Sequence, residues 1–124
     1  MAGSERSGFG VSRADLFRGS TWILTFDNRT NGGAYLRLTD FLIGLGVRIV
    51  PMTAEVHDDV VSQISHLPHL IAYSLMAQAA APAGRGPRQD LAAGSFRDLV
   101  RVSGAAPSIW TEICRRNSPA IRLA

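Results

Sequence analysis

Residues 21–26 read TWILTF, and this stretch decides the fold class of the N-terminal part of the chain. It is a compact run of β-branched and aromatic residues, which favour strands, and it lies between Gly19 and the turn-forming pair Asp27 and Asn28. The run therefore predicts a buried strand. Just before it, residues 12–17 have a capping serine and two large apolar residues, which predicts one or two turns of helix.

A helix and a second strand are expected after this strand. Apolar residues recur at helical spacing within residues 35–45, and glycines mark the end of that segment. Residues 47–50 then form a short β-branched run, which we expect to end before Pro51. The order strand, helix, strand is typical of an α/β domain in which the helix covers one face of a sheet.

From Thr53 to about Ala80 the sequence predicts one long helix. Acidic residues occupy its opening turns, where the helix dipole favours negative charge. Pro68 lies inside the segment and predicts a kink, because it lacks a backbone donor. The apolar residues of this helix form a continuous stripe, which consists of Val60, Ile64, Leu67, Ile71 and Leu75.

Residues 81–95 are rich in glycine and proline and predict a linker, after which residues 96–102 and 109–116 predict two short helices. The fold class that follows is mixed: an α/β part over residues 1–51, then an all-α part over residues 52–124.

Composition indicates a folded protein. The chain has 124 residues, of which 46% are hydrophobic and 19% charged, so it is expected to bury one modest core. All of its basic residues are arginines, and only Arg115 and Arg116 are adjacent. Since no basic face follows from this spacing, we expect no nucleic-acid partner.

Cysteine content and hydropathy bear on the cellular compartment. A single cysteine, Cys114, excludes an internal disulfide and a cysteine zinc cluster, and is most simply a packing thiol. No segment has the length of a membrane span, and the first residues lack the apolar core of a signal peptide. We expect a cytoplasmic protein without a membrane partner.

Two histidines are the first candidates for chemistry. His66 and His69 lie three residues apart beside Pro68, so both can face one cleft as hydrogen-bonding or proton-transfer groups. They can equally be ordinary, partly buried histidines. A small zinc-binding protein is a further alternative, but His57 is half a turn out of phase with His66 on a straight helix.

A second candidate site lies in the C-terminal third. Arg97 and Arg101 are one helical turn apart, a spacing that can grip a carboxylate, although solvated helix charges explain it as well. Trp110 is most simply a core anchor between short helices.

Six motifs follow one another along the chain: MAGSERSG at 1–8, LFRGSTWILT at 16–25, AEVHD at 54–58, SHLPH at 65–69, FRDLVR at 96–101 and PSIWTEIC at 107–114. Taken in this order, they resemble the prephenate and arogenate dehydrogenase family. The resemblance covers nearly the whole chain, and six motifs in the right order are more specific than any one of them.

The resemblance implies a fold, a reaction and roles for five residues. The fold is the end of a Rossmann-like dinucleotide-binding domain followed by a helical substrate-binding and dimerisation domain. The reaction is the NAD- or NADP-dependent oxidative decarboxylation of prephenate or arogenate in tyrosine biosynthesis, carried out by a homodimer. His69 would hold the substrate, His66 would support the cleft, and Glu5 would orient the site. Arg101 would bind a substrate carboxylate in the partner's site, with Trp110 close to that pocket.

The sequence also departs from the family pattern. The family's principal catalytic histidine precedes the position of Met1, and no glycine-rich phosphate-binding fingerprint follows a strand here. We therefore name no catalytic residue and expect the isolated chain to be inactive. The alternative function is a non-catalytic helical dimerisation remnant of such an enzyme. Phe26 also stands where the family strand is usually followed by proline.

Overall fold

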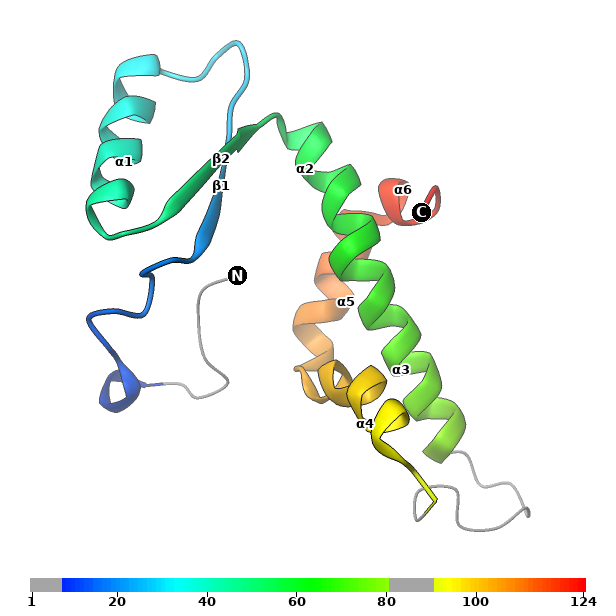
Figure 1. Cartoon of the computed structure of the whole chain (residues 1–124). Coiled ribbons are helices and arrows are strands. Elements are labelled where there is room, and N and C mark those ends of the chain that lie inside the picture. The colour runs from blue at the N-terminus through cyan, green and yellow to red at the C-terminus, as the bar shows by residue number, and fades with distance from the viewer. Residues whose placement is uncertain (1–7, 81–90) are drawn as a thin grey trace. The chain divides into compact units, whose positions relative to one another are not determined.

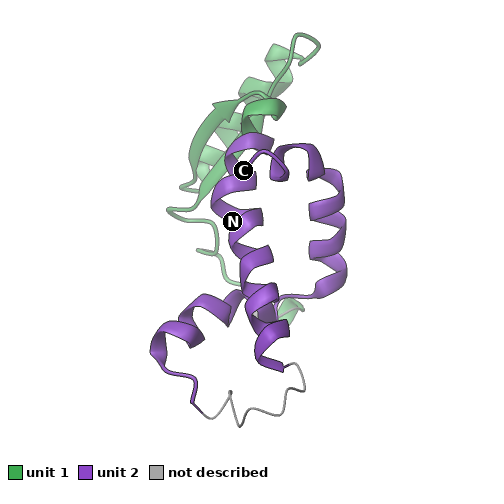
Figure 2. Ribbon diagram, turned by 90° about the vertical axis from the view of Figure 1, so that its right-hand side faces the viewer, with its two compact units in different colours: residues 1–57 green, residues 58–124 purple. Residues whose placement is uncertain are grey.

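The computed structural model describes residues 8–80 and 91–124 (Figure 1). The chain divides into two compact units, Met1–His57 and Asp58–Ala124, which Figure 2 shows in green and purple.

The first unit contains a parallel strand pair connected by a helix. Strand β1 (Thr21–Thr25) pairs in register with β2 (Arg48–Met52), and helix α1 (Gly32–Gly44) lies between them in the sequence. Asn31 is the N-cap of α1: its side-chain Oδ1 accepts a hydrogen bond of 2.9 Å from the Ala34 N–H. The strand, helix, strand order expected from the sequence is therefore confirmed.

The segment before β1 differs from its prediction. It contains a short 3-10 helix (Phe9–Val11) and then a series of turns, where a short helix was expected further along. Backbone hydrogen bonds between residues three positions apart close these turns. In one of them, the Leu16 N–H donates to the Arg13 carbonyl at 3.2 Å. The Arg13 guanidinium also pairs with Asp15, two residues away, at 2.9 Å. These backbone bonds form successive turns and not a continuous helix.

Pro51 lies inside β2 and not beyond its end, so the expected end of this strand was wrong. Arg48 N–H donates to Ser20 O at 2.9 Å, and Met52 O accepts from Phe26 N–H at 3.2 Å. Because alternate residues of a parallel strand face the partner strand, the nitrogen of Pro51 points away from β1. The missing donor therefore costs no ladder bond.

Phe26 extends the sheet by one hydrogen bond. Its backbone N–H, which a proline at this position would lack, donates to the Met52 carbonyl. Its ring also makes an edge-to-face contact with Tyr35 of α1, with ring centroids 6.3 Å apart. The departure from the family pattern therefore ties the end of β1 to both β2 and α1.

The predicted long helix is present, with a π-helical turn where a kink at Pro68 was expected. Helix α2 (Ala54–Val61), the π turn η2 (Ser62–His66) and α3 (Leu67–Ala80) follow one another without a break. The Leu67 N–H donates to the Ser62 carbonyl, five residues back. Since Pro68 has no N–H to offer the carbonyl four residues earlier, a wider turn accommodates it.

Four short helical elements complete the second unit. They are α4 (Gly94–Val100), the 3-10 turn η3 (Arg101–Gly104), α5 (Pro107–Arg116) and α6 (Ser118–Ile121). The first and third correspond to the two predicted helices, whereas α6 was not predicted. The Tyr73 hydroxyl of α3 donates to the Ala105 carbonyl at 2.7 Å and fixes the connection into α5. Residues 81–90 of the predicted linker lie outside the described residues.

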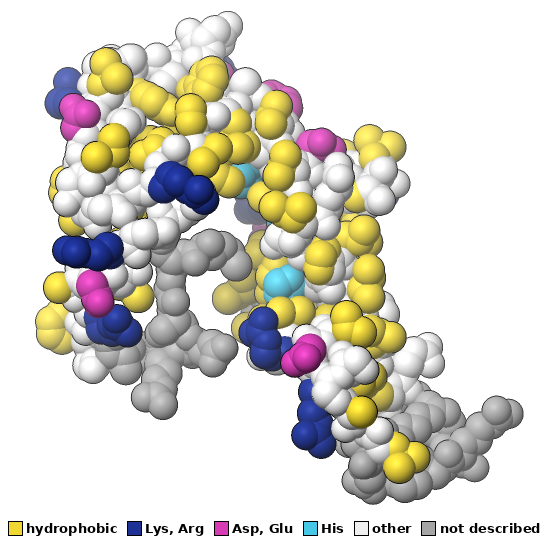
Figure 3. All heavy atoms as spheres, viewed as in Figure 1, with side chains coloured by type: hydrophobic (Ala, Val, Ile, Leu, Met, Phe, Trp, Pro, Cys, Tyr) yellow, Lys and Arg dark blue, Asp and Glu magenta, His cyan; other side chains and the backbone are white. Residues whose placement is uncertain are grey.

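Many large apolar side chains are exposed, as Figure 3 shows on one face. In the apolar stripe, Ile64 is 72% exposed and Ile71 48%, while α1 exposes Leu36 and Phe41. Exposed apolar surface of this kind marks places where other protein surface binds. In the part of the chain that the structure describes, no helix combines the length and apolar character needed to cross a membrane.

Candidate functional site

A stacked pair of rings connects α3 to α5. The His69 imidazole lies on the indole of Trp110, with ring centroids 3.4 Å apart and planes inclined by 17°. Trp110 is only 8% exposed and begins the second turn of α5, a helix with Pro107 at its first position. The proline and the buried indole together hold this face of α5 against α3.

The ring orientation of His69 is set from its own helix. Its Nδ1 lies 3.0 Å from the carbonyl oxygen of Ser65, one turn earlier. A carbonyl can only accept, so Nδ1 carries the hydrogen and, in the neutral ring, Nε2 has the free lone pair. His69 can therefore accept a proton or a hydrogen bond from a hydroxyl group at Nε2.

His66 approaches the same indole from its edge. The His66 and Trp110 ring centroids are 6.1 Å apart, and the planes are inclined by 77°. The Nδ1 of His66 lies 3.1 Å from the amide nitrogen of Asn117, which is buried at the junction of α5 and α6. The structure thus brings together His66, His69 and Trp110, three of the five residues that the sequence singled out.

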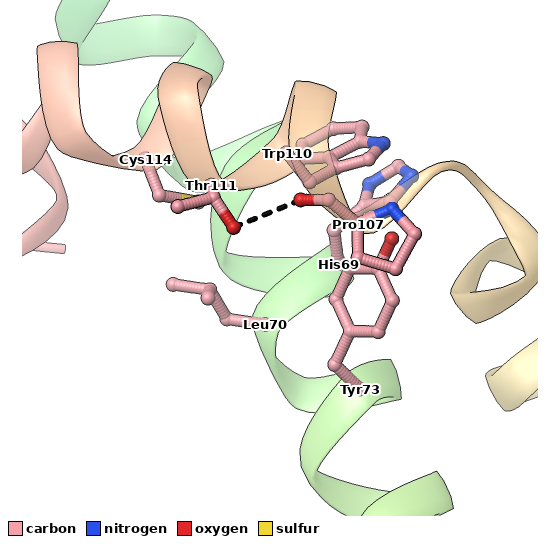
Figure 4. Close-up of a pocket in the computed structure, with 7 residues that line it drawn as sticks. All are labelled: His69, Leu70, Tyr73, Pro107, Trp110, Thr111 and Cys114. Carbon is pink, nitrogen blue, oxygen red and sulfur yellow. Dashed lines mark hydrogen bonds between the residues drawn. The ribbon is translucent and has the colours of Figure 1, made fainter.

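A cavity of about 340 Å³ lies beside the stacked pair, between α3 and α5. Figure 4 shows its lining, which consists of His69, Leu70, Tyr73, Pro107, Trp110, Thr111 and Cys114. Its size suits one small molecule, and its wall is mainly apolar with a few polar groups at the edge. Burial raises the pKa of the Cys114 thiol, so this residue is mainly protonated at neutral pH.

The other predicted residues lie apart from this cluster. Arg101 belongs to η3 and Arg97 to α4; both side chains are exposed, and neither lines the cavity. Glu5 lies outside the described residues. Within residues 8–80 and 91–124 no three metal-ligating side chains are grouped, so the zinc alternative has no ligand set there.

Comparison with known families decides the lineage. The family model for the dimerization domain of prephenate dehydrogenase matches residues 53–123, more than half of the chain and all of the site just described. The chain belongs to the prephenate dehydrogenase family.

Curated relatives and solved structures agree with this family. The chain is 39% identical to a cyclohexadienyl dehydrogenase of Zymomonas mobilis, over 98% of this chain and 42% of that protein. An arogenate dehydrogenase structure from Synechocystis matches 97% of this chain, with a TM-score of 0.80 and 32% identity over 44% of its own length. A prephenate dehydrogenase from A. aeolicus, in complex with hydroxyphenyl propionate and NAD⁺, covers the whole chain with a TM-score of 0.88 and 27% identity. The match covers 44% of the A. aeolicus structure. The chain therefore spans less than half the length of each of these three proteins.

Membership of the prephenate dehydrogenase family fits the observed architecture. The parallel pair β1 and β2 with α1 corresponds to the end of a Rossmann-like domain, and the elements from α2 to α6 correspond to the helical domain that follows. The fold class that the sequence implied is therefore confirmed.

Two residues of the site were missed at the sequence level. Asn117 follows Trp110 by seven positions, which is two helical turns, so both lie on the same face of α5. The seven-residue spacing from Trp110 could have identified Asn117. Tyr73 follows His69 by four positions on α3, and its hydroxyl binding to Ala105 had no signal in the sequence.

The junction of β1 and α1 does not fit the pyrophosphate of a prephenate dehydrogenase cofactor. A dinucleotide-binding turn leaves the first helical N–H groups open to the phosphates. Here the Asn31 side chain already occupies the Ala34 N–H, and Gly32 and Gly33 do not form the glycine fingerprint. None of the residues at this junction is therefore assigned to cofactor binding.

Proposed function

We propose that this chain supplies the substrate-binding and dimerisation part of a prephenate or arogenate dehydrogenase of the cytoplasm. Such an enzyme oxidatively decarboxylates its substrate in tyrosine biosynthesis. The observation that carries the proposal is the His66, Trp110 and His69 cluster beside a cavity of ligand size, inside the region matched by the family model.

In this proposal His69 holds the substrate and Trp110 forms the floor beneath its imidazole. The neutral His69 ring offers a lone pair at Nε2, which suits the hydroxyl group of the substrate ring. His66 supports the cleft through its edge-to-face contact with the indole. Glu5 would orient the substrate side chain, as the family resemblance implies.

The proposal also assigns Arg101 to a partner subunit's site. Its side chain is exposed on η3 and does not line this chain's cavity, as expected of a residue that acts across an interface. An arginine suits this role because its planar guanidinium binds a carboxylate through two parallel hydrogen bonds. The active assembly is then a homodimer.

NAD or NADP would accept the hydride in the complete enzyme. The A. aeolicus relative was solved with NAD⁺, which supports NAD for the family. Since no glycine-rich phosphate-binding fingerprint follows a strand in this sequence and no catalytic residue is assigned, we expect the isolated chain to show no turnover. Pure chain that reduces either cofactor in the presence of prephenate or arogenate would contradict this part of the proposal.

Ligand binding tests the site without requiring turnover. We would titrate the chain with hydroxyphenyl propionate, prephenate and arogenate and follow the fluorescence of Trp110 in a Trp22→Phe background. Saturable quenching is expected, because a ligand in the cavity displaces water from the stacked pair. His69→Ala should weaken binding about tenfold or more. The matched control is His57→Ala, since His57 does not line the cavity.

The alternative is a non-catalytic dimerisation remnant. The exposed residues of the apolar stripe, Val60, Ile64 and Ile71, favour it as a second candidate, because a remnant would keep the dimer surface without the substrate site. Dimerisation together with no saturable binding of any of the three ligands would favour the remnant. Specific binding that His69→Ala removes would exclude it.

A further inference from the structure

Asn117 is a buried polar residue with no role in the function proposed above. It is 7% exposed and lies where α5 ends and α6 begins. Its backbone joins the two helices, since its N–H donates to Ile113 O and its carbonyl accepts from Ile121 N–H. Its side chain faces the same side of α5 as Trp110, two turns earlier.

The orientation of the Asn117 amide follows from its partners. Its Nδ2 lies 2.8 Å from the carbonyl oxygen of Asp58, which is 59 residues away in the sequence and can only accept. The NH₂ group and not the oxygen must therefore point this way. The same nitrogen lies 3.1 Å from Nδ1 of His66, so its second hydrogen is directed to that ring. The His66 Nδ1 must then be an acceptor.

The two histidines consequently differ in their tautomers. A neutral imidazole that accepts at Nδ1 carries its hydrogen on Nε2, which is the state this geometry gives to His66. His69 has the opposite state, because its Nδ1 donates to the Ser65 carbonyl. Both rings contact the indole of Trp110; one can accept at Nε2, and the other carries its hydrogen there.

We propose that Asn117 is a positioning residue that holds His66 in the Nε2–H tautomer, through an amide anchored on the Asp58 carbonyl. In its consequence for ligands, the proposal rests on the function above. His66 contacts the indole of Trp110, on which His69 is stacked beside the cavity, so a His66 ring held in one state keeps that stacked pair in place for a ligand. Asn117 therefore supports ligand binding indirectly, through His66 and Trp110.

The test is a long-range proton–nitrogen NMR spectrum of the ¹⁵N-labelled chain at a pH where the imidazoles are neutral. The sequence has three histidines, and single His→Gln variants assign them. We expect the Nε2–H pattern for His66 and the Nδ1–H pattern for His69. A wild-type His66 with its hydrogen on Nδ1 would overturn the proposal without any variant.

Variants separate positioning from structural support. In Asn117→Asp a carboxylate replaces the NH₂ donor and can only accept, so the His66 hydrogen should move to Nδ1 or the ring should become charged. Asn28→Asp makes the same change at an exposed position and should leave the His66 signals unaltered. A folded Asn117→Asp chain that keeps the wild-type His66 tautomer would refute the assignment.

Ligand titration then distinguishes this inference from the proposed function. Asn117→Asp should weaken binding of hydroxyphenyl propionate about tenfold, the cost of losing one buried hydrogen bond, while Asn28→Asp should not. If the tautomers are as stated but no ligand binds, the function fails and the positioning role stands. If ligands bind but Asn117→Asp leaves the His66 tautomer unchanged, the positioning role fails and the function stands.

Discussion

The two units differ in what they bury. In the first, the buried residues that the structure describes are aliphatic, Leu42 and Val47, and the side chains around them are largely exposed. In the second, they include the aromatic Trp110 and two polar residues, Ser62 and Asn117. A two-stranded sheet with one helix has little apolar surface to bury, whereas the helical unit encloses hydrogen-bonded groups that need exact partners. Specific recognition is therefore expected from the second unit, and the first is expected to be the less stable.

Replacing Trp110 should cause the largest difference in stability between the two units. Trp110→Ala deletes the indole that contacts both histidines, and is expected to destabilise the second unit by about 3–5 kcal/mol. In urea, helical circular dichroism should be lost early, while the fluorescence of Trp22, which lies in the first unit, should keep its midpoint. The control is Trp22→Phe, in which the remaining fluorescence comes from Trp110 of the second unit. If both signals shift together, the units unfold as one and the comparison fails.

The next effect concerns the exposed stripe of the second unit. Ile64→Asp should leave the folded monomer nearly unchanged, because this side chain is 72% exposed, but should weaken a dimer formed through the stripe. Loss of one buried isoleucine costs about 2 kcal/mol, or about thirtyfold in the dissociation constant.

Sedimentation equilibrium measures this change. Leu123→Asp provides a matched control, since Leu123 is also exposed but lies outside the stripe. Identical association of both variants and the wild type would show that the stripe takes no part in dimerisation.

A smaller effect is expected at the start of α1. Asn31→Ala removes the side-chain oxygen that accepts from Ala34 N–H and should destabilise the first unit by about 1 kcal/mol. The Trp22 fluorescence midpoint in urea should fall, with no change in ligand binding by the second unit. Asn28→Ala, in the same loop, serves as the control and should have a smaller effect. An equal loss in both variants would contradict the capping role.

The smallest effect is one of reactivity. Because burial raises the pKa of Cys114, the thiolate fraction at a given pH is lower than for a free cysteine. Alkylation by iodoacetamide should therefore be slower in the folded chain, and its pH–rate profile should be displaced to higher pH. The urea-unfolded chain should recover the ordinary profile. A ligand that fills the cavity should slow the reaction further, since Cys114 lines it.

Local pattern was enough to predict the regular elements and the meeting of the histidines. β1, α1 and α5 follow from short-range periodicity and bounding turns. The spacing of His66 and His69 puts both rings against Trp110, although only His69 lines the cavity. Two features depended on information that no local window contains. Pro51 stays in β2 because its nitrogen faces away from β1, which follows from the register of the strand pair. Asn117 acquires its role from Asp58, 59 residues away.

The π turn at Ser62–His66 has a consequence for how this chain should be aligned with its relatives. A π turn holds about one residue more than an α turn, so it acts as a single-residue insertion in an otherwise regular helix. Everything after it is rotated by about 100° relative to a helix without it. A relative that lacks the turn should therefore align with a one-residue gap between Asp58 and His66. Forcing a gap-free alignment there would match its histidines to the wrong positions of this chain.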